Sequence, residues 1–247
     1  MGPIITLLTD FGLTDSYVGE LRATLLSQAH GALLVDVTHE IAPGDIRGAQ
    51  YIFSRVWHRF PAGCVHLVVV DPGVGTDRRA LAAASSGHFF VAPDNGLLSS
   101  LPGDARFVSL PIPPGAGATF HARDVFAPAA ARLVIGTALT HLGPLISDPH
   151  RAPLPVSKSD GATLVGEVIY VDRFGTLITN IAGAHVAPGT LVCVAGRDVG
   201  PLRRTFGDVE RGQLLAFVGS GETVEIAVRD GSATRLLGVA VGAEVRI

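Results

Sequence analysis

The stretch VHLVVVDPGVGTDRR, residues 65–79, carries the pattern that decides the fold. Its first six residues are apolar except for His66, and the run ends at Asp71, where proline and glycine introduce a turn. An unbroken apolar run of this length predicts a central strand of a parallel sheet, covered on both faces. Two similar runs, 4–8 and 33–37, come earlier in the chain and bring Asp10 and Asp36 to their ends.

Helical spacing of apolar residues separates these predicted strands. One set follows residue 17 and a second follows Asp45, whose side chain is suited to cap a helix N-terminus. Strands that alternate with helices predict an α/β layer with a mainly parallel sheet. Further strands are expected at 80–84 and 89–91, and a further helix at 124–135.

A change of composition at residues 149–161 predicts a linker, because this segment is rich in proline and polar residues. We therefore expect an N-terminal α/β domain over residues 1–150 and a second domain over residues 161–247. Short strands separated by turn residues, with no helix required, predict a small β-barrel for the second domain. These strands are expected at 165–170, 177–181, 190–194, 214–218, 224–228 and 243–247.

Composition excludes several classes of protein. The 247 residues carry a formal net charge of -3 and no long block of lysine or arginine, so nucleic acid is not an expected partner. Cys64 and Cys193 lie in apolar runs, which argues against a disulfide framework and fits the cytoplasm. No run reaches the roughly 20 apolar residues that span a membrane, and no histidine spacing typical of a metal site occurs.

Polar segments follow the apolar runs, at the sheet edge where α/β proteins bind ligands. Thr9–Asp15 offers two carboxylates and two hydroxyls, and Asp71–Arg79 allows Arg78 to return and pair with Asp71. His121 stands just before a predicted helix. Residues 171–180 form a polar turn between two strands. Taken singly, residues 9–15 favour a turn with a helix cap, and His121 favours a structural role. Residues 71–79 fit a structural ion pair as well as a functional site, and residues 171–180 also fit a hairpin turn.

Four motifs in this order resemble the S-adenosyl-L-methionine hydroxide adenosyltransferase family, which is related to the S-adenosylmethionine-dependent fluorinase and chlorinase. The resemblance extends over essentially the whole chain. The motifs are Thr-Asp-Phe-Gly at 9–12, Asp-Pro-Gly-Val-Gly-Thr at 71–76, Ala-Pro-Asp-Asn-Gly-Leu-Leu at 92–98 and Arg-Asp-Val-Phe-Ala-Pro at 123–128.

The resemblance implies hydrolysis of S-adenosyl-L-methionine (SAM) to adenosine and methionine by attack of water at the ribose 5′ carbon. No metal or other cofactor takes part in the implied reaction. By motif position, Asp71, Arg78 and His121 correspond to the set that holds and activates the attacking water. The resemblance also implies a homotrimer whose active sites lie at subunit interfaces, between the N-terminal domain of one subunit and the C-terminal domain of its neighbour.

Substrate-binding residues follow from the same resemblance. Asp10 corresponds to the carboxylate that holds the ribose diol, and Asp172 to the one that holds the methionine amino group. Phe174 and Phe206 resemble the walls of the adenine pocket, and Ser220 lies near the methionine carboxylate. The remaining candidates for substrate binding are Asp15, Thr76 and Thr176, the last standing where relatives commonly have asparagine.

Two alternative functions would use the same pocket. A 5′-halogenase of the related branch has tyrosine at the position of Asp71 and serine or glycine after the histidine, where this chain has Ala122. A non-catalytic SAM or nucleoside sensor would keep the pocket without turnover. A third interpretation treats Asp10, Asp36 and Asp71 as magnesium ligands of a phosphohydrolase.

Overall fold

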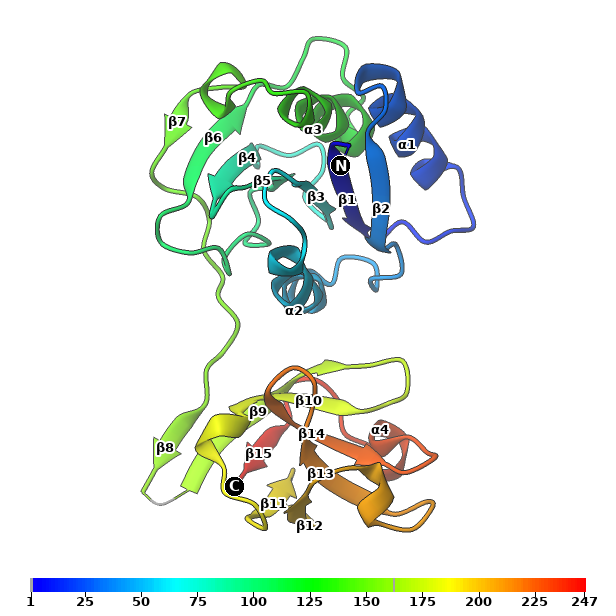
Figure 1. Ribbon diagram of the computed structural model, residues 1–247, viewed down its shortest axis with the longest axis vertical. Helices are drawn as coiled ribbons and strands as arrows, with labels where there is room; N and C mark the ends of the chain where they lie inside the picture. Colours follow the sequence, from blue (N-terminus) through cyan, green and yellow to red (C-terminus); the bar gives the residue numbers. More distant parts are fainter. Residues whose placement is uncertain (1, 162) are drawn as a thin grey trace. The chain divides into compact units, whose positions relative to one another are not determined.

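The computed structural model describes residues 2–161 and 163–247 and divides the chain into two compact units, one ending at Pro153 and the other beginning at Leu154. Figure 1 shows a layered α/β architecture in the first unit and a β-barrel in the second. The predicted fold class, an α/β domain followed by a small barrel, is confirmed.

The first unit is built on a seven-stranded sheet of order β2-β1-β3-β5-β4-β6-β7. The four neighbouring strands β2, β1, β3 and β5 run parallel to one another. β4 runs antiparallel to both of its neighbours, β5 and β6. The elements are β1 (Ile4–Thr9), α1 (Tyr17–Gln28), β2 (Leu33–Thr38), α2 (Ile46–Val56), η1 (Trp57–Arg59), β3 (Val65–Val69), β4 (Ala80–Ser85), β5 (His88–Pro93), β6 (Arg106–Leu110), η2 (Ala122–Phe126), α3 (Ala127–Val134), η3 (Leu139–His141) and β7 (Leu145–Ile146).

Helices cover both faces of this sheet, α1 and α3 on one and α2 on the other (Figure 1). Every residue of β1 and β3 is buried, as the continuous apolar runs predicted. Asp45 caps α2 as expected, with its side chain accepting a hydrogen bond from the backbone of Gly48 at 2.9 Å. Because β1 and β3 are parallel neighbours, their ends lie side by side at one edge of the sheet.

Two predicted elements of the first unit differ in the structure, and the strands β6 and β7 were not predicted. The run 33–37 was expected to be central, but β2 is the outer strand, and Leu33 is 56% exposed. Apolar composition alone does not distinguish an inner from an outer strand, because position in the sheet depends on pairing. The helix expected at 124–135 begins earlier, as the π-helical turn η2, and continues as α3.

The second unit is a closed barrel. Seven strands form the ring β10-β14-β13-β12-β11-β15-β9, which the pairing of β9 with β10 closes, and β8 extends β9 on the outside. The elements are β8 (Lys158–Asp160), β9 (Thr163–Val171), β10 (Leu177–Ala182), η4 (Gly183–His185), β11 (Leu191–Val194), β12 (Arg197–Arg203), η5 (Phe206–Asp208), β13 (Leu214–Val218), β14 (Thr223–Val228), α4 (Ala233–Leu237) and β15 (Glu244–Arg246).

Three elements of this unit contradict the sequence interpretation. Lys158–Asp160, assigned to the linker, is a strand, and β12 was not expected because its sequence is polar and contains glycine and proline. The expectation that no helix is needed here is wrong, since α4 lies at Ala233–Leu237. Its boundaries carry ordinary signals: the Ser232 side chain caps the N-terminus, and Gly238 ends the helix with a φ of 62°.

None of the helices in the described residues is long and apolar enough to cross a membrane.

Candidate active site

An ion pair lies where β3 ends. Nε of Arg78 donates to Oδ1 of Asp71 at 2.9 Å, and Nη2 donates to Oδ2 of the same carboxylate. Both side chains are nearly buried, with exposed fractions of 7% for Asp71 and 9% for Arg78. A two-point contact of this kind fixes the plane of the guanidinium and keeps a buried carboxylate paired.

His121 completes a cluster of three side chains. Nη2 of Arg78 also lies 3.0 Å from Nδ1 of His121. Arginine has only donors, so Nδ1 is the acceptor, and the neutral imidazole carries its proton on Nε2. Burial and the neighbouring positive charge of Arg78 lower the pKa of His121 below its usual value of 6.5. The histidine is therefore neutral at pH 7.

The π-helical turn η2 supports this cluster from the other side. The Arg78 guanidinium lies 5.1 Å from the ring centre of Phe126, a fully buried residue at the end of η2. Turns of this type occur frequently at functional sites, because one extra residue in the turn redirects the neighbouring side chains. Here the turn begins directly after His121.

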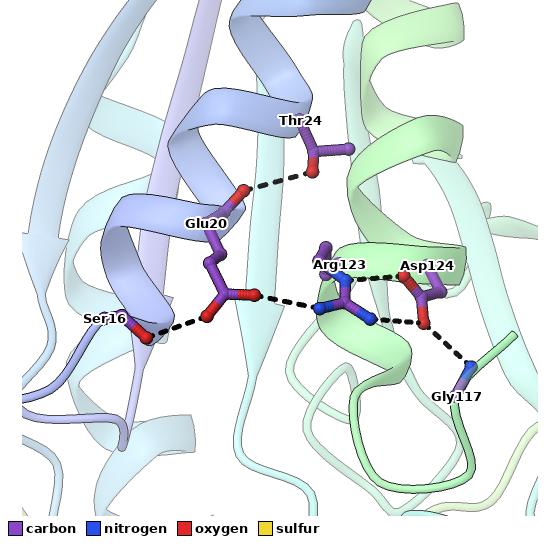
Figure 2. A network of polar contacts seen from close by, with 6 residues as sticks. All are labelled: Ser16, Glu20, Thr24, Gly117, Arg123 and Asp124. Atoms are coloured by element: carbon purple, nitrogen blue, oxygen red, sulfur yellow. Dashed lines mark hydrogen bonds and ion pairs between the residues drawn. The ribbon is translucent and has the colours of Figure 1, made fainter.

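A network of polar contacts ties η2 to α1 (Figure 2). Arg123 donates to both carboxylate oxygens of Asp124, at 2.7 and 3.1 Å, and to Glu20 on α1 at 2.8 Å. Asp124 also accepts from the backbone of Gly117 at 2.8 Å, which closes the loop that leads to His121. The hydrogen bonds from Arg123 hold the pKa of Asp124 below its usual range. This network fixes the loop on which His121 stands.

The loop between Asp71 and Arg78 requires glycine at one point. Gly75 has a φ of +80°, and a Cβ there would lie 2.6 Å from the carbonyl oxygen of Ala118. Any other residue would be strained and would push apart the loops that carry Arg78 and His121.

A cavity of about 390 Å³ opens beside the cluster. Asp10, Asp71 and His121 line it together with Phe11, Phe120 and Ala122. Oδ2 of Asp10 accepts from the backbone of Gly44 at 2.8 Å, which orients the carboxylate at the end of β1. Asp15 and Thr76 are exposed, and neither belongs to the described residues that line the cavity.

A second cavity, of about 850 Å³, lies in the barrel unit and gathers the predicted substrate-binding residues of that unit. Oδ1 of Asp172 accepts from the backbones of Phe174 and Thr176, at 2.9 and 2.8 Å, so the aspartate also builds the turn. Phe174 is 78% exposed and Thr176 is buried. The predicted residues that line this cavity are Asp172, Phe174, Thr176, Phe206 and Ser220.

Sequence reasoning missed several polar residues of the second cavity. They lie on β14, in the segment that leads into α4 and on α4 itself, and the sequence interpretation assigned no function to these residues. Ser232 and Gly238 are ordinary start and stop signals of a short helix and would have drawn attention to this segment. The missed residues are Glu225, Arg229, Asp230, Ser232 and Arg235.

The three strand-end aspartates do not assemble. Asp71 pairs with Arg78, Asp36 pairs with Arg22, and Asp10 binds the backbone of Gly44. Within residues 2–161 and 163–247, no three side chains of histidine, cysteine, aspartate or glutamate form a group able to hold a metal ion. The magnesium phosphohydrolase interpretation therefore has no ligand set among these residues.

Comparison with protein families gives two matches, one for each unit. The model of the SAM hydroxide adenosyltransferase N-terminal domain matches residues 5–143, and the model of the C-terminal domain matches residues 166–246.

Individual proteins match along most of the chain. An (R)-S-adenosyl-L-methionine hydrolase from Thermus thermophilus is 44% identical, over 97% of each chain. A crystal structure described as an uncharacterized conserved protein from Thermotoga maritima superposes with a TM-score of 0.89 at 33% identity, covering 98% of each chain. A fluorinase from Actinoplanes sp. is 30% identical over 72% of each chain.

Proposed function

Because this chain belongs to the SAM hydroxide adenosyltransferase family, we propose that it is a SAM hydrolase that forms adenosine and L-methionine. The observation that carries the proposal is the cluster of Asp71, Arg78 and His121 at the edge of a cavity large enough for part of the substrate. Both the cluster and the family membership point to water as the nucleophile.

The proposed reaction is a single displacement. The oxygen of a water molecule attacks the ribose 5′ carbon as the bond to sulfur breaks, and the electron pair of that bond goes to sulfur. Methionine leaves as a neutral thioether, adenosine gains the hydroxyl, and one proton is released. Because the sulfonium is already a good leaving group, the protein mainly has to hold the water in line and accept its proton.

The hydrogen bonds within the cluster favour a division of roles. His121 accepts from Arg78 at Nδ1, so its Nε2–H is available as a donor to the water or to the developing hydroxide. Asp71 remains as the proton acceptor, and two hydrogen bonds from Arg78 orient its carboxylate. Among the described residues, Nη1 of Arg78 is buried without a hydrogen-bond partner.

Substrate contacts complete the proposal. Asp10 holds the ribose diol, and Asp172 and Ser220 hold the amino and carboxylate groups of methionine. Phe174 and Phe206 cover the adenine ring, which accounts for the high exposure of Phe174 in the free barrel unit. Thr176 lines the same cavity as Asp172, whereas Asp15 and Thr76 are exposed and belong to the described lining of neither cavity.

Electrostatics separate this activity from halogenation. A halide at the position of the water would lie beside the Asp71 carboxylate and lose its hydration there, and two neighbouring negative charges repel each other. Water has no such penalty and benefits from the carboxylate as a base.

The test is product analysis. Purified protein with SAM, a metal chelator and no cofactor should yield adenosine and methionine, with oxygen from labelled water in the adenosine 5′-hydroxyl. Added chloride or fluoride should give no 5′-halogenated nucleoside. Chromatography with mass detection separates the outcomes: a halonucleoside would identify a halogenase, and tight binding of SAM without turnover would identify a sensor.

We also propose a homotrimer in which each substrate contacts residues of two neighbouring subunits. Asp71→Asn and Asp172→Ala chains are each expected to be inactive alone. Mixed trimers made from equal amounts of the two should regain activity at about a quarter of their sites. An active site there combines the intact first unit of an Asp172→Ala chain with the intact barrel unit of an Asp71→Asn chain. Sedimentation gives the mass, and failure of the mixture to regain activity would mean that each site belongs to one chain.

A cytoplasmic location is part of the proposal and is supported by the two free cysteines, of which Cys64 is buried.

A further inference from the structure

The motif at residues 92–98 has no role in the reaction as proposed, yet it lies against the catalytic loop. It begins at the end of β5, the parallel neighbour of β3 in the sheet. Because parallel neighbours end at the same edge, residues 94 and 95 lie beside the start of the loop 71–79. Two consecutive residues of the motif contact the two ends of that loop.

Asn95 holds the start of the loop. Its Nδ2 donates to the backbone carbonyl of Val70 at 2.8 Å, and its Oδ1 accepts from the backbone of Leu97 at 3.3 Å. The carbonyl of Val70 belongs to the peptide unit that carries Asp71. The direction in which the Asp71 side chain leaves the backbone therefore depends on this contact.

Asp94 holds the end of the loop. Its backbone N–H donates to the carbonyl of Arg79 at 2.9 Å, and its Oδ2 accepts from Nε of Arg79 at 2.7 Å. The Asp94 side chain is 5% exposed, and its other oxygen accepts from the backbone of His150 at 2.7 Å. Arg79 directly follows Arg78, so the contact fixes the backbone from which Arg78 reaches back to Asp71.

The loop needs this support. It contains Gly73 and Gly75, and glycine loses more conformational freedom on ordering than any other residue. The Asp71–Arg78 contact itself joins the two ends only through side chains. Anchors on the backbone at residues 70 and 79 reduce the range of positions that the two side chains sample.

We infer that Asp94 and Asn95 are positioning residues, which hold Asp71 and Arg78 in the geometry that activates water. The expected effect of these residues on catalysis rests on the proposed function. The structural part of the inference, that residues 94 and 95 order the loop 71–79, stands without it.

Asn95→Asp removes the donor to Val70 at nearly constant shape. Asp94→Asn removes one of the two carboxylate charges that contact Arg79, the other being that of Asp148. Each variant should lower kcat by about 10- to 100-fold and change KM by less than about threefold, because a displaced catalytic group slows chemistry more than it weakens binding. Backbone amides of residues 71–79 should exchange hydrogen for deuterium faster than in the unaltered protein.

Thr6→Val is the matched control, since it also removes one buried hydrogen bond of the first unit, between Oγ1 of Thr6 and Nδ1 of His66 at 2.7 Å. It should leave kcat within about twofold and exchange at 71–79 unchanged. Full kcat in both motif variants, or unaltered exchange in the loop, would overturn the inference. Absence of SAM turnover in the unaltered protein would instead refute the proposed function, while the exchange measurement would still decide the structural part.

Discussion

Replacing Arg78 by methionine is expected to lower kcat for SAM hydrolysis by about 10²- to 10⁴-fold, with a change in KM of less than about threefold. The guanidinium contacts Asp71 and His121 at once and stacks on Phe126, so its loss removes the orientation of the whole cluster. Stopped assays with adenosine quantification give both constants.

Stability complicates this variant, because Asp71 would stay buried without a partner, which costs about 3–5 kcal/mol. Arg78→Lys keeps the charge and should fold. One ammonium lacks the planar fork that holds two carboxylate oxygens and an imidazole together, so kcat should still fall by about 10-fold or more. Arg22→Met, which breaks another Arg–Asp pair of the same unit, is the control and should stay within about twofold. A fully active Arg78→Lys would reduce Arg78 to a structural ion pair.

Acid is expected to destabilise the first unit through His66. This histidine is 1% exposed, and its Nδ1 and Nε2 lie 2.7 Å from Oγ1 of Thr6 and 3.1 Å from Nδ1 of His88. Burial, with a smaller contribution from His88, lowers the pKa of His66 from 6.5 to about 3. Burial also lowers the pKa of His88.

The direction of the pH effect follows from proton uptake. Between pH 6.5 and about 3, the unfolded chain binds a proton at residue 66 that the folded chain does not, so the free energy of unfolding falls as the pH falls. Full linkage amounts to about 1.4 kcal/mol per pH unit, or roughly 5 kcal/mol over the interval.

Urea unfolding at a series of pH values tests this expectation. His66→Gln keeps a polar side chain that does not titrate, so its stability should depend less on pH below 6.5 than that of the unaltered protein. His58→Gln, at an exposed histidine, should leave the slope unchanged. Equal slopes for all three proteins would mean that His66 does not control acid stability.

The architecture was predictable wherever local sequence decides structure. Continuous apolar runs predicted β1 and β3. The turn at Asp172 was predictable because an aspartate side chain accepts hydrogen bonds from backbone N–H groups a few residues further on, here those of Phe174 and Thr176. β12 was not predictable, since its place in the ring depends on pairing with β11 and β13 and not on its own polar sequence. The outer position of β2 was missed for the same reason.

In the candidate site, too, some contacts could be predicted from local sequence and others depend on the fold. Six residues that form a turn separate Asp71 from Arg78, so their ion pair could be expected from the spacing. His121 lies 43 residues beyond Arg78, and only the family resemblance joined it to the pair. The contact of Asn95 with Val70 arises because β3 and β5 are neighbours, which neither motif reveals alone.

Closure of the barrel has a consequence for the order of folding. β15 lies between β11 and β9, with Glu244 opposite Glu167, and its insertion completes the ring. The ring therefore cannot close until residues 244–246 have been synthesised and have returned across most of the unit. Contacts between distant segments form slowly, because chain entropy is lost before any pairing is gained. During synthesis, the first unit can reach its native state while the barrel is still an open sheet.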